Sequence, residues 1–187
     1  AGTVEFMVSG DEFFFREMNT RLQVEHPVTE TITGLDLVEW QIRVAQGEVL
    51  PVGQDEVTTS GHAIEVRLYA EDPANAYLPN TGMLRVFDVH PAAGIRVDTG
   101  FVAGDAVTAN YDPMLAKVIA HGPTRAAAAE RLAAYLRRAG VEGVVTNKDS
   151  LAAVLGERDF LAGATTTDYL DNHPEVLAPP VDAIRHG

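Results

Sequence analysis

The sequence contains no cysteine, few lysines and no long apolar run. Without cysteine it can form neither a disulfide bond nor a thiolate metal site. Only two of its 14 basic residues are lysines, Lys117 and Lys148, and its 27 acidic residues bring the formal charge to −13. This acidity argues against binding to nucleic acid or an anionic membrane, because phosphate neutralisation requires clustered basic residues. No apolar segment approaches the roughly 20 residues of a membrane-spanning helix, and no segment resembles a secretory signal.

The composition favours a packed globular chain. Hydrophobic residues make up 46% of the 187 positions, and this length suits one large domain or two small ones. Residues 1–6 already resemble the start of a strand, so we expect the sequence to begin inside a domain. The polar, turn-rich residues 51–60 predict a boundary, which gives two domains at 1–60 and 61–187.

Hydrophobic periodicity predicts an α+β fold. Residues 3–8 and 13–21 are rich in strand-forming residues and flank a turn cluster, which predicts a β-hairpin. Apolar residues three and four positions apart predict a helix at 35–45, with Asp36 and Glu39 as a capping box. Further predicted strands are 62–69, 84–89, 95–98, 106–108, 115–120 and 141–145, the predicted helices run from Pro123 to Gly140, 148–155 and 166–172, and 70–82 is a predicted loop.

Residues 17–25 carry an unusual polar face. Written as one extended strand, this segment places its side chains alternately on two faces. One face holds large polar groups about 6.6 Å apart, namely Glu17, Asn19, Arg21, Gln23 and Glu25. Carboxylates flank a guanidinium there, which indicates either a solvent-exposed face with an internal salt bridge or a binding site.

Glu5 bears on the choice between these interpretations. With a three-residue hairpin loop, Gly10 to Glu12, Glu5 lies opposite Glu17, and this like-charge pair is destabilising unless a cation lies between the carboxylates. With a two-residue loop, Glu5 instead faces Arg16 in a surface ion pair that contributes little. We favour the three-residue loop, which predicts a divalent-cation site formed by Glu5 and Glu17, with Asn19 as a further oxygen ligand.

Such a ligand set suggests a metal–nucleotide site. It leaves most of an octahedral shell open, where Mg²⁺ keeps water molecules or binds substrate phosphates. Arg21 next to the metal can hold a small planar anion through two parallel hydrogen bonds. Glu25 lies beyond it, within reach of a proton on that anion, and can serve as a general base.

Four segments of the chain resemble the biotin carboxylase family, in the family's order. They are residues 3–6 (TVEF), 17–30 (EMNTRLQVEHPVTE), 61–73 (GHAIEVRLYAEDP) and 112–117 (DPMLAK). This family is the ATP-grasp component of acetyl-, propionyl- and related acyl-CoA carboxylases. The resemblance implies that 1–60 is the C-terminal portion of an ATP-grasp domain, an antiparallel sheet with helices. It implies that 61–187 is the biotin carboxylase C-terminal domain, a mixed and mainly antiparallel sheet with helices.

The resemblance also implies a reaction. ATP activates bicarbonate to carboxyphosphate, and the CO₂ derived from it carboxylates biotin. Carried over residue by residue, the resemblance implies that the ligands of Mg²⁺ or Mn²⁺ are Glu5, Glu17 and Asn19. Glu5 and Glu17 also serve ATP binding. Bicarbonate is held by Arg21, Gln23 and the backbone of Val24. Glu25 takes the bicarbonate proton, and Arg67 binds biotin and stabilises its enolate.

The same resemblance implies partners and a compartment. A separate carrier domain holds biotin, a carboxyltransferase subunit selects the acyl-CoA, and the intact protein is a homodimer. The compartment is the cytoplasm in a bacterium or the mitochondrial matrix in a eukaryote. Nucleic acid and membrane are not expected as partners.

Some features depart from the family pattern. Arg16 stands where the family usually has an apolar residue, on the face of Met18. The sequence has no glycine-rich phosphate loop, so we expect the nucleotide-clamping lobe to lie upstream and the fragment to be inactive by itself. Neither lysine lies in a Met-Lys-Met sequence, so we expect biotin to be carried elsewhere. The alternatives are another ATP-grasp ligase, such as a purine-pathway carboxylase or a carbamoyl-phosphate synthetase, or a non-catalytic subunit-interaction module.

Overall fold

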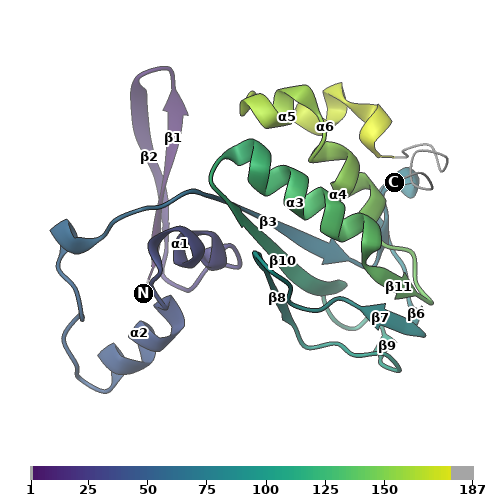
Figure 1. The fold of residues 1–187 in the computed structure, drawn as a ribbon, viewed down its shortest axis with the longest axis horizontal. Helices are drawn as coiled ribbons and strands as arrows, with labels where there is room; N and C mark the ends of the chain where they lie inside the picture. The colour runs from purple at the N-terminus through teal and green to yellow at the C-terminus, as the bar shows by residue number, and fades with distance from the viewer. Residues whose placement is uncertain (1, 178–187) are drawn as a thin grey trace. The chain divides into compact units, whose positions relative to one another are not determined.

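The computed structural model describes residues 2–177. The chain divides into two compact units, Ala1–Ser60 and Gly61–Gly187, and each is described by itself. The strands and helices of the first unit are β1 (Thr3–Ser9), β2 (Glu12–Asn19), α1 (His26–Thr33) and α2 (Leu37–Ala45), followed by a 3₁₀ turn at Gln54–Glu56 (Figure 1). No helix within residues 2–177 combines the length and hydropathy needed to cross a bilayer.

The first unit is a hairpin followed by two helices. Strands β1 and β2 pair antiparallel, as the sequence predicts. Helix α2 begins two residues later than predicted, because the Asp36 side chain caps it by accepting a hydrogen bond from Glu39 N at 2.8 Å. Helix α1 was not predicted. It ends at Gly34, whose φ of +72° is the left-handed conformation that glycine adopts at helix ends.

The second unit is built on a three-stranded antiparallel sheet of order β3-β10-β8. The strands and helices of this unit are β3 (His62–Tyr69), β4 (Glu71–Asp72), β5 (Leu78–Pro79), β6 (Gly82–Met83), β7 (Val86–Asp88), β8 (Ile95–Thr99), β9 (Ala106–Val107), β10 (Met114–Gly122), α3 (Arg125–Arg138), β11 (Gly140–Glu142), α4 (Lys148–Val154), α5 (Arg158–Ala162) and α6 (Tyr169–Asn172). Short two-stranded ribbons join β4 to β5, β6 to β9 and β7 to β11. All pairings among the described strands are antiparallel, which confirms the predicted fold class.

The predicted loop at 70–82 contains paired strands rather than irregular chain. Asp72 pairs with Leu78, and a 3₁₀ turn at Pro73–Asn75 joins the two short strands. Helix α3 begins at Arg125 and not at Pro123, because the Thr124 hydroxyl caps it by accepting from Ala127 N at 3.2 Å.

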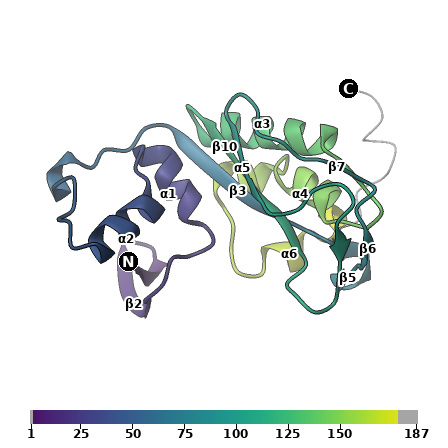
Figure 2. The same cartoon turned by 90° about the horizontal axis from the view of Figure 1, so that it is seen from below.

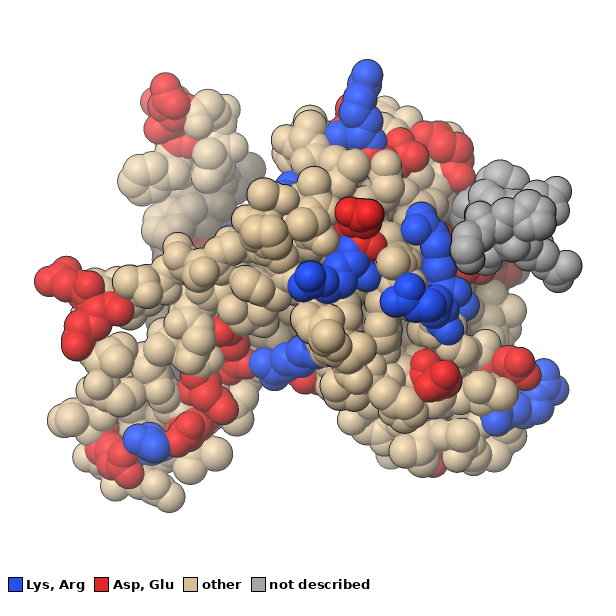
Figure 3. Space-filling view, viewed as in Figure 1, with Lys and Arg blue, Asp and Glu red and all other residues tan. Residues whose placement is uncertain are grey.

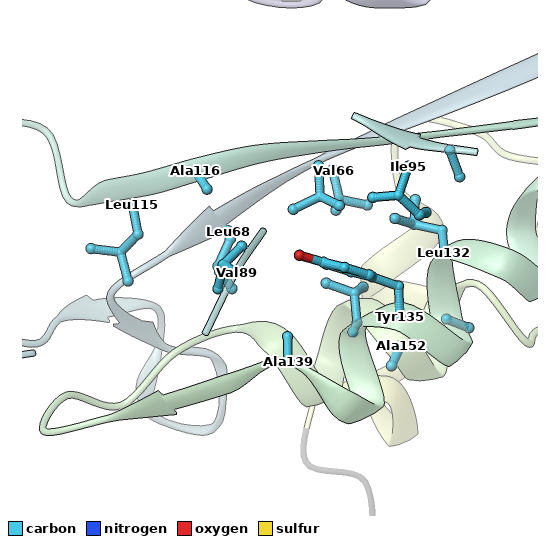
Figure 4. Packing of buried hydrophobic residues seen from close by; sticks show 14 of the residues in the cluster. Val66, Leu68, Val89, Ile95, Leu115, Ala116, Leu132, Tyr135, Ala139 and Ala152 are labelled. Atoms are coloured by element: carbon cyan, nitrogen blue, oxygen red, sulfur yellow. The ribbon is translucent and has the colours of Figure 1, made fainter. Parts of the chain in front are cut away.

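One hydrophobic core lies in the second unit, between its sheet and helices. Helix α3 packs against β10 and β3, and α4 packs against α3 and β3 (Figure 2). In Figure 4, Val66 and Leu68 of β3 and Leu132 of α3 point into the same apolar cluster. Tyr135 reaches across from α3, and its hydroxyl donates to His90 O at 2.9 Å. These contacts fix the position of strand β3 and so of the polar residues on its other face.

Candidate active site

The hairpin brings Glu5 and Glu17 directly opposite each other. The predicted three-residue loop is wrong, because Ser9 pairs with Glu12 and leaves only Gly10 and Asp11 in the turn. The register instead shifts between Glu5 and Phe6, a β-bulge that leaves one extra residue on β2. A two-residue turn and a bulge therefore produce the pairing that the sequence analysis expected from a longer turn.

Polar side chains converge on the Glu5 carboxylate. The amide nitrogens of Asn19 and Gln23 donate to Glu5 Oε1 at 2.6 and 2.8 Å. Arg16 Nη1 donates to Glu5 Oε2 at 3.1 Å, and Arg16 Nη2 lies 4.0 Å from Glu17 Oε1. The predicted position of Arg16 on the face of Met18 is wrong, since the ion pairs bring its guanidinium to the carboxylates.

The predicted strand through Glu25 is also wrong. Strand β2 ends at Asn19, and residues 20–25 form an irregular segment that leads into α1. Pro27 in the first turn of α1 has a backbone angle suited to a helix start, so the preceding residues turn instead of extending. Strict alternation stops at Asn19, yet Gln23 still reaches Glu5 because the chain folds back toward the hairpin.

A pocket of about 600 Å³ lies next to this cluster in the first unit. Its lining includes Arg21, Gln23 and Glu25, with His26 and Trp40 among the other residues around it. His26 Nδ1 lies 2.8 Å from Gln23 O, and its Nε2 lies 3.8 Å from Oε2 of the buried Glu30. The imidazole therefore connects the turn before α1 to the helix itself. No spacing signal in the sequence identifies His26 or Trp40 as pocket residues.

The remaining bicarbonate candidates differ in their surroundings. Arg21 is exposed, and its Nη1 lies 3.4 Å from Leu22 O. Val24 is half-buried in the turn before α1. Glu25 occupies the N-cap position of α1, although its side chain makes no capping bond, and it is one of the residues that line the pocket.

The side chains of Glu5, Glu17 and Asn19 suit a divalent cation that prefers oxygen ligands. Two carboxylates and an amide supply hard oxygen ligands and leave positions for water or phosphate. Among residues 2–177, no group of three or more His, Cys, Asp or Glu side chains has metal-binding geometry.

Arg67 belongs to the second unit, so its convergence with the hairpin stays a prediction. It is half-buried on β3, where its backbone lies opposite Lys117 of β10. A separate pocket of about 370 Å³ is lined by residues that include Arg67, Glu65 and Glu71.

Asn147 fixes the main chain between Arg67 and Tyr69. This asparagine is only 6% exposed, and its Nδ2 donates to Arg67 O at 3.1 Å and to Glu71 Oε1 at 3.2 Å. Its Oδ1 accepts from Tyr69 N at 2.9 Å. Burial raises the pKa of Glu71 above its usual range, the Asn147 hydrogen bond opposes this, and the charge of Asp112 adds to it. The end of β3 is therefore tied to the start of α4.

Family models match both units of the chain. The model of the biotin carboxylase C-terminal domain matches residues 65–172. The model of the carbamoyl-phosphate synthase L chain, ATP binding domain, matches residues 1–52. The first unit thus matches an ATP-binding domain and the second a biotin carboxylase C-terminal domain.

Curated relatives agree with these matches. The chain is 49% identical over 176 residues to biotin carboxylase of Halalkalibacterium halodurans, covering 94% of this chain and 39% of that protein. It is 50% identical over 179 residues to the mitochondrial methylcrotonoyl-CoA carboxylase subunit alpha of Glycine max, covering 95% of this chain and 24% of that protein.

Solved structures give the same result. The biotin carboxylase subunit of pyruvate carboxylase superposes with a TM-score of 0.93 at 44% identity, over 96% of this chain and 40% of that one. The biotin carboxylase domain dimer of Hydrogenobacter thermophilus 2-oxoglutarate carboxylase, in complex with MgADP and bicarbonate, superposes with a TM-score of 0.92 at 40% identity, over 96% and 40% of the two chains. The chain belongs to the biotin carboxylase family, which confirms the resemblance of residues 17–30. It spans about 24% to 40% of the length of these relatives.

Proposed function

We propose that the protein containing this chain carboxylates biotin with ATP and bicarbonate, as the biotin carboxylase component of an acyl-CoA carboxylase. Residues 1–60 would be the C-terminal portion of its ATP-grasp domain and 61–187 its C-terminal domain. The separate family matches to residues 1–52 and 65–172 support this division. The observation that carries the proposal is the opposed pair Glu5 and Glu17 beside a pocket lined by Arg21, Gln23 and Glu25.

In this proposal, Glu5 and Glu17 would hold Mg²⁺ or Mn²⁺, with Asn19 as an additional ligand. When bound, the ion would neutralise charge at the transferring phosphoryl group. The hydrogen bonds from Asn19 and Gln23 hold the Glu5 carboxylate in one orientation. The complex of the Hydrogenobacter thermophilus domain with MgADP and bicarbonate supports a magnesium nucleotide and bicarbonate as the bound molecules.

Bicarbonate would bind between Arg21 and Gln23. The planar guanidinium of Arg21 can donate two parallel hydrogen bonds to the anion. Gln23 has two amide protons, of which one bonds Glu5, so the other can donate to bicarbonate together with the backbone N–H of Val24. Glu25 would accept the bicarbonate proton, which frees the oxygen that attacks the γ-phosphate of ATP.

Arg67 would act at the second substrate, biotin. Loss of the N1 proton leaves negative charge on the ureido oxygen, and a fixed guanidinium stabilises that charge. The hydrogen bond from Asn147 to Arg67 O supports this role, because it fixes the backbone from which the side chain extends.

The proposed partners follow from the same reaction. A biotin carrier domain and a carboxyltransferase would work with the intact protein, which would be a homodimer, as the name of the Hydrogenobacter thermophilus complex describes for that domain. The proposed compartment is the cytoplasm in a bacterium or the mitochondrial matrix in a eukaryote, and the methylcrotonoyl-CoA carboxylase relatives named mitochondrial support the second case.

The substitution Glu17→Gln tests the proposal in the intact protein. It keeps the side-chain shape and removes the negative charge that the cation needs, so bicarbonate-dependent ATP cleavage should fall by about 100-fold or more. Glu12→Gln is the control, since Glu12 lies at the exposed turn end of the same strand opposite Ser9. ATP turnover at saturating Mg²⁺ that is equal in Glu17→Gln and the wild type would defeat the metal assignment.

A further inference from the structure

Arg16 contacts both members of the acidic pair. Its guanidinium donates to Glu5 Oε2 at 3.1 Å and lies 4.0 Å from Glu17 Oε1. The β-bulge next to Glu5 explains how it reaches them, because the extra residue on β2 removes Arg16 from the regular alternation of the strand. The Arg16 side chain is 59% exposed, against 26% for Glu5 and 53% for Glu17.

This arginine is unexpected in its surroundings. Arg16, Arg21 and Arg43 are the only basic residues in positions 1–60 of the sequence. On the face drawn in Figure 3, red acidic side chains also outnumber blue basic ones over the first unit. The family resemblance predicts an apolar residue at position 16. Here a positive charge stands instead beside two carboxylates that oppose each other across the hairpin.

The position of Arg16 affects any cation that binds the pair. Glu5 Oε1 accepts from Asn19 and Gln23, and Glu5 Oε2 accepts from Arg16, so each Glu5 oxygen already has a donor. A divalent cation that bridges Glu5 and Glu17 needs an oxygen from each. The oxygens nearest Arg16 are Glu5 Oε2 and Glu17 Oε1, so cation and guanidinium compete for the same atoms.

We propose that Arg16 is a built-in counter-ion of the Glu5–Glu17 pair, which a divalent cation must displace in order to bind. The inference rests on the proposed metal-binding role of Glu5 and Glu17. It has two consequences. Without metal, Arg16 relieves the repulsion between opposed carboxylates and stabilises the hairpin. With metal, the competing charge raises the free Mg²⁺ or Mn²⁺ concentration that the site needs.

The experiment measures Mn²⁺ binding to the intact protein without nucleotide, from the electron paramagnetic resonance signal of free Mn²⁺. The relevant binding is the component that Glu17→Gln removes. We expect Arg16→Leu to lower the apparent Kd of that component roughly threefold to tenfold, and Arg16→Lys to change it less. Arg43→Leu is the matched control, because Arg43 pairs with Glu39 within helix α2, and its Kd should equal that of the wild type.

Thermal unfolding gives a second readout. In excess chelator, Arg16→Leu should unfold at a lower temperature than the wild type, and saturating Mn²⁺ should remove most of this difference. If Arg16→Leu does not fold, Arg16→Gln removes the charge and keeps hydrogen-bond donors, and the same comparison applies.

The outcomes separate the inference from the proposal beneath it. An equal or higher Kd in the charge-removing variant overturns the counter-ion role, while the metal site stands. If neither the wild type nor Arg16→Leu shows Mn²⁺ binding that Glu17→Gln removes, both the metal site and the counter-ion role are overturned.

Discussion

Arg67 is the residue whose replacement should separate the two half-reactions. Asn147 bonds the backbone oxygen of Arg67 and not its side chain, so Arg67→Ala leaves that anchor of β3 intact. We expect bicarbonate-dependent ATP hydrolysis to remain within about twofold of wild type, while carboxylation of free biotin falls by about 100-fold, because only the second step develops charge on biotin. Both rates can be measured on the intact protein.

Arg85→Ala is a suitable control for that prediction, since Arg85 is an exposed arginine of the same unit. It should leave both rates unchanged. A parallel loss of ATP hydrolysis and biotin carboxylation in Arg67→Ala would count against the role of Arg67 at biotin.

Side-chain placement in the candidate site was predictable only where a regular strand persists. Side-chain alternation along β2 predicted correctly that Glu17 and Asn19 share a face near Glu5. The bulge was not predictable, because no residue type signals whether a two-residue turn is compensated by an extra residue further along the strand. For the same reason the sequence placed Arg16 on the wrong face, although the charge itself signalled a departure from the family pattern.

Between strands, Asp98 links two basic residues on the polar face of the sheet. It accepts from Arg96 Nε at 2.8 Å on β8 and lies 3.2 Å from Lys117 Nζ on β10. Lys117 is in turn opposite Arg67 on β3, so Asp98 supplies negative charge beside a like-charge cross-strand pair. Burial opposes ionisation of Asp98, but the hydrogen bonds from Arg96 and Lys117 outweigh it and lower the pKa of Asp98.

We therefore expect Asp98→Asn to destabilise the protein by about 1 kcal/mol at neutral pH. Because the folded-state pKa is the lower one, this stabilisation is complete above the unfolded-state pKa of about 3.9 and is lost as pH falls through the folded-state value. Urea unfolding from pH 7 to pH 3 should show a constant gap between wild type and variant above about pH 5, and a shrinking gap below about pH 4. Asp88→Asn, at a carboxylate that is 73% exposed, is the control. A gap that persists unchanged to pH 3 would contradict the ionic origin of the effect.

Elements with strong periodicity were predicted best. Strand β3 has the predicted bounds, since apolar and polar residues alternate along all of it and one face enters the core. Helices α1 and α5, of eight and five residues, were not predicted, whereas the similarly short helices α4 and α6 were. The three threonines of α1 also lower its helix propensity, and the contact between His26 and Glu30, one turn apart in the helix, supports it.

The two units bury apolar surface very unequally, which bears on the stability of the candidate site. Every residue of the described hydrophobic core cluster belongs to positions 64–155, in the second unit. Among residues 2–60, only Pro27 and Glu30 are buried. The hairpin instead exposes large apolar side chains, including Val8 at 73%, Phe13 at 70% and Phe15 at 66%. Among residues 2–60, these side chains therefore lie outside any hydrophobic core.

This asymmetry predicts how the two units behave when they are produced separately. Residues 61–187 should unfold cooperatively in urea, with a free energy of unfolding of roughly 5–10 kcal/mol, because they contain a complete core. Residues 1–60 should show poorly dispersed amide resonances and bind a hydrophobic dye, since an isolated two-stranded hairpin is marginally stable in water. The edge-to-face contacts of Phe6 with Phe13 and Phe15, at 5.7 and 6.4 Å, are too few to replace a core. A well-dispersed spectrum and cooperative unfolding of residues 1–60 alone would show instead that the hairpin holds Glu5 and Glu17 in register without the rest of the protein.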